Sequence, residues 1–238
     1  MSDARGPGAE LEAALSSLAS ETGDHPAVSV PDFHALARQL DAETGPAAWL
    51  RSRSTSERFG VLIAVAVAAS VVAATLGGWT DLALLAQGRL VLEFALLGGF
   101  ALLGMAGSVR GYHHRELPRW MGWGLIGATL VVPLALALMP MPSAEVPEGA
   151  AMAAALGCLM YGLAIAAPVL LVAWVLDRGS WRGRPSVRYA ASAAGLAGLV
   201  GLQLHCPVHH AEHLMVGHLP VVLAMLGTAA VLGVLSRR

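Results

Sequence analysis

The chain has 238 residues, of which 56% are hydrophobic and only 13% are charged, and its formal net charge is −1. A mean hydropathy of +0.63, together with long uncharged stretches, excludes an ordinary soluble globular protein and favours a membrane protein. We expect an all-α polytopic bundle in contact with membrane lipid, with no direct contact to nucleic acid.

The first 50 residues are predicted to form a short, polar tail with two amphipathic helices. Eight acidic residues stand against two arginines there, a balance that suits a basic protein partner. About 50 residues provide little material for an independent core. The tail is therefore either partly disordered or folds into a groove on a partner. Its two apolar helical faces hold the candidate partner-binding residues Leu11, Leu15, Leu18, Phe33, Leu36 and Leu40.

Six apolar runs follow the tail, each near the roughly 20 residues that cross about 30 Å of hydrocarbon as a helix. A helix also satisfies the backbone hydrogen bonds inside a bilayer. Trp49 and the arginine-rich residues 51–58 resemble an interfacial anchor before the first run. The runs cover 59–78, 90–109, 120–140, 151–176, 187–204 and 213–235. We thus expect a tail of residues 1–58 and a six-helix transmembrane domain of residues 59–238.

Arginine placement predicts the orientation of these spans. All 15 basic residues are arginines, and Arg89 alone lies in a loop on the opposite side from the other fourteen. The positive-inside rule then puts both termini in the cytoplasm, with multiple passes through the membrane. The polar first 50 residues do not indicate a cleavable signal peptide. Glu93, four residues after Arg89, is predicted either to form a local ion pair with it or to snorkel toward the membrane surface.

A dense His/Cys cluster lies in the loop that this topology places outside. Residues 205–218 hold five of the nine histidines and one of the two cysteines. In a helix, His209 and His213 share one face, and His210 and His213 share an adjoining one. His205 and Cys206, at the end of the preceding span, would come close, giving a nitrogen and sulfur site for zinc, copper or cadmium. His218 would either complete this site or bond a neighbouring helix.

The second thiol, Cys158, is predicted to lie in the outer half of the fourth span. The two cysteines would form a disulfide, bind a soft metal together with His205, or stay buried and inert. The spacing of the histidines is not that of a metalloprotease, and no nucleophile elbow, P-loop or dinucleotide motif is present. We therefore predict a regulator and not an enzyme.

The sequence from the His-Cys-Pro at 205–207 to the histidines at 213 and 218 resembles the NrsF-type integral-membrane anti-sigma factors. That resemblance implies six spans and a cytoplasmic segment that holds an extracytoplasmic-function (ECF) sigma factor until an envelope, metal or oxidative signal arrives. The tail matches only in being short, cytoplasmic and amphipathic, and it lacks the zinc-binding His/Cys pattern of many soluble anti-sigma domains. A metal-ion-handling membrane protein and a haem-binding electron carrier, with His205 and His218 as axial ligands, remain as alternatives.

Overall fold

The computed structural model of the chain describes residues 45–77, 87–110, 117–139, 150–176, 186–208 and 210–235. Contacts divide the chain into residues 1–44 and 45–238, and only the second unit is described. The six candidate partner-binding residues of the tail, and His209, lie outside the described residues. Throughout the described part of the chain the secondary structure is helical, as the sequence predicts.

The first long helix begins earlier than the apolar pattern predicts, because polar residues cap it. A short helix α3 (Pro46–Arg51) leads into α4 (Thr55–Gly77). The Ser54 backbone N–H donates to the Glu57 carboxylate at 2.8 Å, and the Glu57 N–H donates to Ser54 Oγ at 3.3 Å. This reciprocal pair is a capping box. It starts α4 at Thr55, four residues before the predicted first span.

Within the described residues, five helical segments are long and apolar enough to cross a membrane, as expected for a membrane protein. They match five of the six predicted runs to within a few residues. The second combines α5 (Gln87–Glu93), η2 (Phe94–Gly98) and α6 (Gly99–Ser108), and the last combines α10 (Ala211–His213), η3 (Leu214–His218) and α11 (Leu219–Leu235). The others are α4, α7 (Arg119–Ala137) and α8 (Ala151–Leu176).

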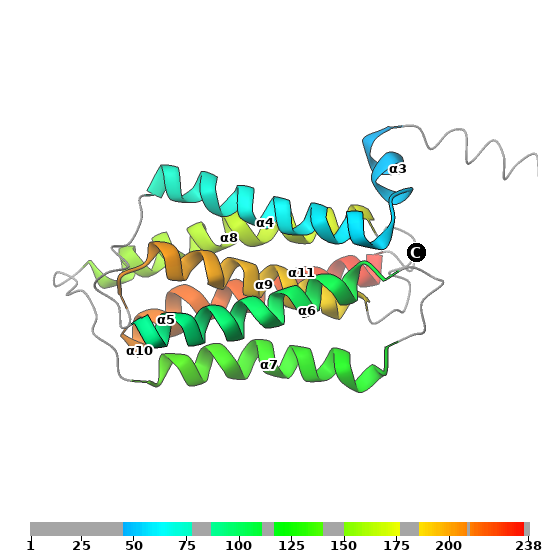
Figure 1. Cartoon of the computed structure of the whole chain (residues 1–238). Helices are drawn as coiled ribbons and strands as arrows, with labels where there is room; N and C mark the ends of the chain where they lie inside the picture. Colours follow the sequence, from blue (N-terminus) through cyan, green and yellow to red (C-terminus); the bar gives the residue numbers. More distant parts are fainter. Residues whose placement is uncertain are drawn as a thin grey trace, which may run out of the picture. The chain divides into compact units, whose positions relative to one another are not determined.

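The remaining predicted run forms α9 (Ser186–His205), a 20-residue helix that is not among the five. It lies in the middle of the other helices (Figure 1) and contacts α4, α6, α7, α8 and α11. Almost every residue from Tyr189 to Gln203 is buried. Because protein covers α9 on all sides, its surface can be less hydrophobic than that of a helix facing lipid.

Small residues let α9 approach its neighbours closely, because glycine and alanine leave little side chain between two helix backbones. A Cβ atom added at Gly198 would lie 2.8 Å from the Gly162 carbonyl oxygen of α8 and 2.9 Å from Val221 Cγ1 of α11. A Cβ atom at Gly195 would lie 3.2 Å from Val222 Cα. Three helix backbones therefore meet at these glycines, and the contact holds α8, α9 and α11 together.

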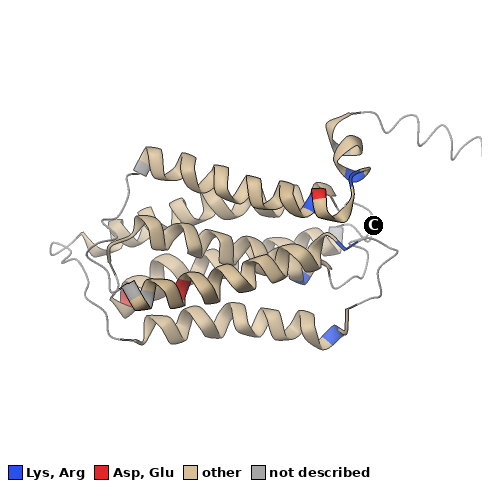
Figure 2. Ribbon diagram, viewed as in Figure 1, with Lys and Arg blue, Asp and Glu red and all other residues tan. Residues whose placement is uncertain are grey.

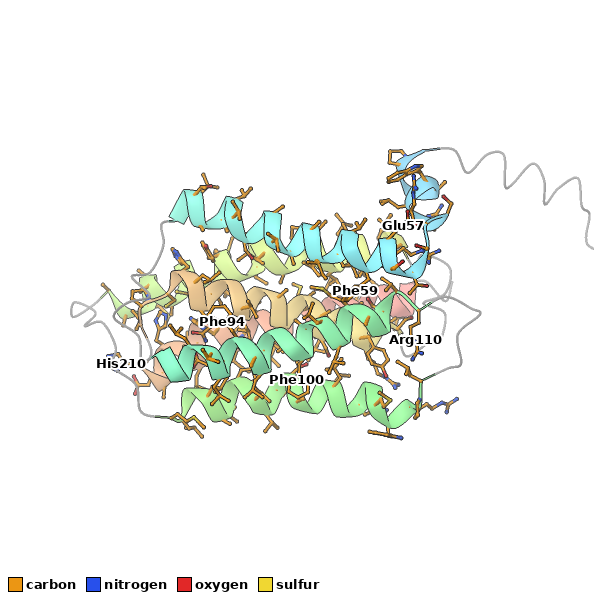
Figure 3. All side chains as sticks on the ribbon, viewed as in Figure 1. Glu57, Phe59, Phe94, Phe100, Arg110 and His210 are labelled. Carbon is orange, nitrogen blue, oxygen red and sulfur yellow. The ribbon has the colours of Figure 1, made fainter. Side chains whose placement is uncertain are left out.

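The two ends of the described unit differ in chemistry. The arginines drawn in blue in Figure 2 gather at one end, which we call the arginine end. Arg110 and Arg188 lie close together there, since both charges act on Tyr189. Figure 3 places Arg110 at this end and His210 at the opposite end. The described part of the His/Cys cluster around His210 therefore lies at the opposite end from these arginines.

Candidate metal centre

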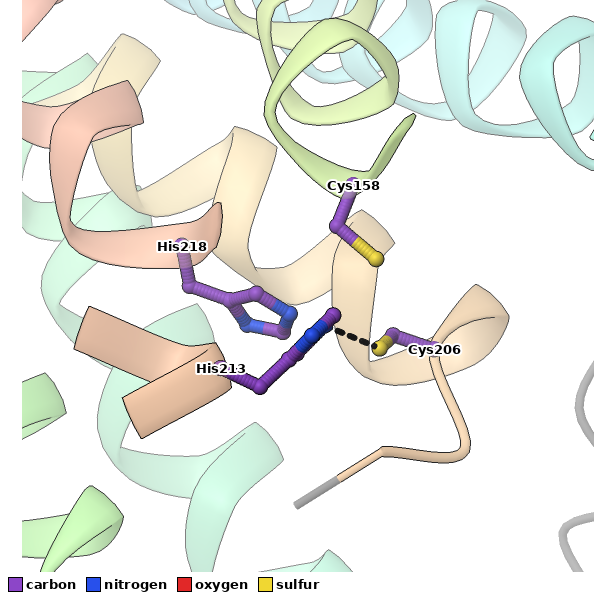
Figure 4. Close-up of side chains that lie close together, drawn as sticks. All are labelled: Cys158, Cys206, His213 and His218. Carbon is purple, nitrogen blue, oxygen red and sulfur yellow. Dashed lines mark hydrogen bonds between the residues drawn. The ribbon is translucent and has the colours of Figure 1, made fainter. Parts of the chain in front are cut away.

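Four buried side chains converge at the end of the bundle opposite the arginines (Figure 4). Cys158 comes from α8, Cys206 follows α9, His213 ends α10 and His218 ends η3. Their ligand atoms all lie within 4.8 Å of one another. Each residue is at most 7% exposed, and both cysteines are free thiols. We call this set the Cys/His group.

Cys206 is held in place by the end of α9 and by the turn after it. Its backbone N–H donates to the Leu202 carbonyl at 2.8 Å, extending the last turn of α9. Its thiol donates to the Val208 carbonyl at 3.6 Å, and Sγ lies 3.2 Å from His213 Nε2. The hydrogen bond with Cys158 and burial raise the pKa of the Cys206 thiol, so binding of a metal ion would release its proton.

A π-helix brings His213 and His218 to the same face. In an α-helix, residues five apart point about 140° away from each other, since each residue turns the helix by about 100°. Residues Leu214–His218 instead form the π-helix η3, in which groups five apart stack about one turn above each other. The two imidazole rings lie edge to face with centroids 5.6 Å apart. This single irregular turn therefore places both rings beside the thiols.

The donor set suits a zinc-like metal ion. Two thiolates and two imidazoles form a common tetrahedral zinc set, with Zn–S near 2.3 Å and Zn–N near 2.0–2.1 Å. Such bonds put neighbouring ligand atoms about 3.5 Å apart, so the group would contract modestly from its present spread. The buried Nδ1 of His213 has no hydrogen-bond partner within the described residues. The ring therefore keeps capacity for one more bond, as expected of a ligand.

Two other predicted members of the cluster, His205 and His210, lie elsewhere. His205 stacks on Tyr161 of α8, with ring centroids 3.9 Å apart and an interplanar angle of 6°. His210 is exposed immediately before α10. Neither belongs to the Cys/His group. Of the seven predicted sensing residues, the structure thus brings together Cys158, Cys206, His213 and His218.

Two polar residues near the group were not predicted to be part of a site. Glu93, which is 1% exposed, and Gln203 line a cavity of about 30 Å³ together with His218, enough space for about one water molecule. Buried polar groups next to a ligand histidine commonly orient its ring. The side chain of Arg89, the predicted ion-pair partner of Glu93, lies outside the described residues. In the sequence, the carboxylate of Glu93 within the apolar run 90–109 was the feature that could have indicated these polar neighbours.

A glycine sets the distance between the last helix and Cys158. A Cβ atom at Gly217 would lie 2.9 Å from the Ala155 carbonyl oxygen and 3.4 Å from Cys158 Cβ. We expect Gly217→Ala to push η3 away from α8 and to weaken Zn²⁺ binding by about tenfold, the lower range for disturbing the support of a ligand. Competition with a chromophoric chelator measures this affinity in the purified protein.

Gly227→Ala on α11 is the matched control, because a Cβ atom there meets nothing within 4 Å. Both substitutions should favour the helical backbone equally, by about 1 kcal/mol. Equal zinc affinities of the two variants would show that the close contact at Gly217 does not position the group.

Comparison with known proteins gives no relative: the chain matches no protein-family model, no curated protein and no solved structure.

Proposed function

We propose that the protein is a membrane-bound anti-sigma factor that senses a metal or oxidative signal at the Cys/His group. The supporting observation is the burial of four metal-binding side chains where α8, α9 and the last helix meet. A ligand bound there would join three helices that otherwise contact through apolar packing. Soft or borderline ions such as Zn²⁺, Cu⁺ and Cd²⁺ suit this mixture of thiol and imidazole.

The proposal places the bundle in a bacterial inner membrane with α9 as a sixth span and both termini in the cytoplasm. The gathering of described arginines at one end (Figure 2) supports this orientation through the positive-inside rule. The Cys/His group then lies near the outer face. It would respond to metal ions or oxidants in the envelope, outside the reducing cytoplasm.

Signalling in this proposal is a change in the packing of the helices. Metal binding draws the four ligands together, and an oxidant that accepts two electrons would join the two thiols as a disulfide with loss of two protons. Either event favours one arrangement of α8, α9 and the last helix over another. The coupling is allosteric only if this balance also changes the affinity of the cytoplasmic tail for its partner.

The tail is proposed to hold the ECF sigma factor through its apolar positions. Because the tail is acidic and too short for its own core, a groove on a basic partner would accommodate its apolar faces. The two faces carry Leu11, Leu15, Leu18, Phe33, Leu36 and Leu40. The protein acts by sequestration in this account and performs no chemical reaction.

Co-purification of the full-length protein with each ECF sigma factor of its host tests the proposal. We expect one sigma factor to be retained in detergent and to be lost from a Leu36→Asp, Leu40→Asp variant, since charge on an apolar contact face prevents its burial. An Ala35→Asp, Gln39→Asp variant is the matched control, because it adds the same charge to the same tail segment on the side opposite the predicted apolar face.

Retention of no sigma factor by a folded protein would contradict the anti-sigma proposal. Zinc binding at the Cys/His group in that case would favour a metal-handling membrane protein, since the group itself supports both functions. The two measurements are independent, because the sigma factor contacts the tail and the metal contacts the bundle.

A further inference from the structure

A large cavity lies at the arginine end, away from the Cys/His group. It has a volume of about 580 Å³ between α6 and α7, within the size range of sites for small molecules. Its walls are mainly apolar and include Phe100 and Leu103 of α6 and Trp120 and Gly124 of α7. Figure 3 shows the Phe100 side chain between these two helices. The cavity thus offers an apolar lining along the bundle.

The cavity is bordered by groups that face outward from the bundle. Leu103 is 61% exposed and Trp120 is 72% exposed. In a protein that spans a membrane, such exposed apolar side chains meet lipid, and tryptophan favours the level of the headgroups. An acyl chain is therefore the apolar occupant with direct access to this cavity.

Polar groups stand at one end of the same cavity. Tyr189 of α9 lines it and is 4% exposed, yet its hydroxyl has no hydrogen-bond partner within the described residues. A buried hydroxyl left without a partner is costly. Arg110 also lines the cavity, and the positive charges of Arg110 and Arg188 act on this hydroxyl. An oxygen-rich anion would satisfy both the hydroxyl and the guanidinium of Arg110.

We propose that this cavity binds one glycerophospholipid with an anionic headgroup. An acyl chain would pack against Phe100, Leu103 and Trp120. The phosphate would lie beside Arg110 and accept a hydrogen bond from the Tyr189 hydroxyl. Basic pockets between membrane helices are suited to anionic headgroups. The inference rests on the membrane placement of the bundle and is independent of sigma-factor binding.

Native mass spectrometry of the full-length protein, purified in detergent and titrated with phosphatidylglycerol or phosphatidylethanolamine, tests the site. We expect one tightly retained lipid and a preference for phosphatidylglycerol. Gly124→Leu should reduce retention at least tenfold, because a Cβ atom at Gly124 meets nothing within 4 Å and the larger side chain would fill the cavity. Gly127→Leu is the matched control: it is equally unobstructed, but Gly127 does not line the cavity.

The headgroup is tested separately with Arg110→Gln and Tyr189→Phe. Loss of one basic residue should reduce the preference for phosphatidylglycerol about fivefold, while loss of the hydroxyl should weaken both lipids. Equal retention by wild type and Gly124→Leu would overturn the site and leave the cavity to a protein segment. An unchanged headgroup preference in Arg110→Gln would overturn the assignment of an anionic lipid.

Discussion

Replacing Cys206 with serine is expected to weaken Zn²⁺ or Cd²⁺ binding by more than about 100-fold. The loss of a group that merely supports a ligand already costs about 10- to 100-fold, and Cys206 is a candidate ligand itself. Its Sγ lies 3.2 Å from His213 Nε2, so the substitution removes a donor that is in direct contact with another member of the group. A serine hydroxyl is a poor replacement, because it keeps its proton, whereas a thiol loses its proton and binds a soft metal as the thiolate.

Substitution with Co²⁺ reports this change, since each thiolate ligand contributes charge-transfer absorption. The band should weaken in Cys206→Ser, where Cys158 is the one thiolate left in the Cys/His group. His210→Ala is the control, because His210 belongs to the same sequence cluster but is exposed and outside the Cys/His group. If His210→Ala weakened binding as much as Cys206→Ser, the metal would be bound by the surface histidines. Wild-type affinity in Cys206→Ser would remove the thiol from the site.

The second large effect is expected from one added methyl group at the centre of the bundle. Gly198→Ala would place Cβ 2.8 Å from a backbone oxygen of α8, which cannot move unless the helices separate. Overpacking of this kind costs about 1–3 kcal/mol, and the better helix propensity of alanine returns about 1 kcal/mol. Because the contact is with a backbone atom, we take the upper cost of about 3 kcal/mol. The free energy of unfolding should therefore fall by about 2 kcal/mol. The unfolding midpoint in detergent should fall by roughly 5 °C.

Gly201→Ala on the same helix separates this effect from a general change in α9. The atom nearest to its Cβ would be Cδ1 of Ile165, with Ser70 Oγ 3.4 Å away. The far end of a side chain yields at lower cost than a backbone oxygen does. We expect its unfolding midpoint to stay within a degree or two of the wild-type value. A similar loss in both variants would mean that α9 tolerates no added volume at all, so that the close contact with the Gly162 carbonyl has no special weight.

Most of the helical architecture could be predicted from the sequence, because uninterrupted apolar runs leave the backbone no partner except itself. The run at 151–176 coincides with α8. The beginning of α4 could not be read from hydropathy, since Ser54 and Glu57 start the helix by hydrogen bonding and are themselves polar. The central position of α9 was also hidden, although its glycines indicated a close contact.

The candidate site was predicted in its location and only partly in its membership. Helical spacing paired His213 with His209 and His210, because these lie four and three residues before it. The structure pairs His213 with His218 across a π-helix. The spacing of apolar and polar residues does not predict this irregular turn. Cys158 and Cys206 come together through the packing of α8 and α9, a long-range contact that local spacing does not contain. His205 stacks on Tyr161 for the same reason.

The low hydropathy of α9 has a consequence for the synthesis of the protein. Its neighbours α8 and the last helical segment have mean hydropathies of 2.3 and 1.9 over their most apolar windows, whereas α9 carries Arg188, Ser192 and Gln203. Such a segment partitions weakly from the translocation channel into lipid by itself. It would leave the channel beside α8, which precedes it, and await α11. In the proposed arrangement with α9 as a sixth span, the insertion of this helix would depend on its packing against α8 and α11.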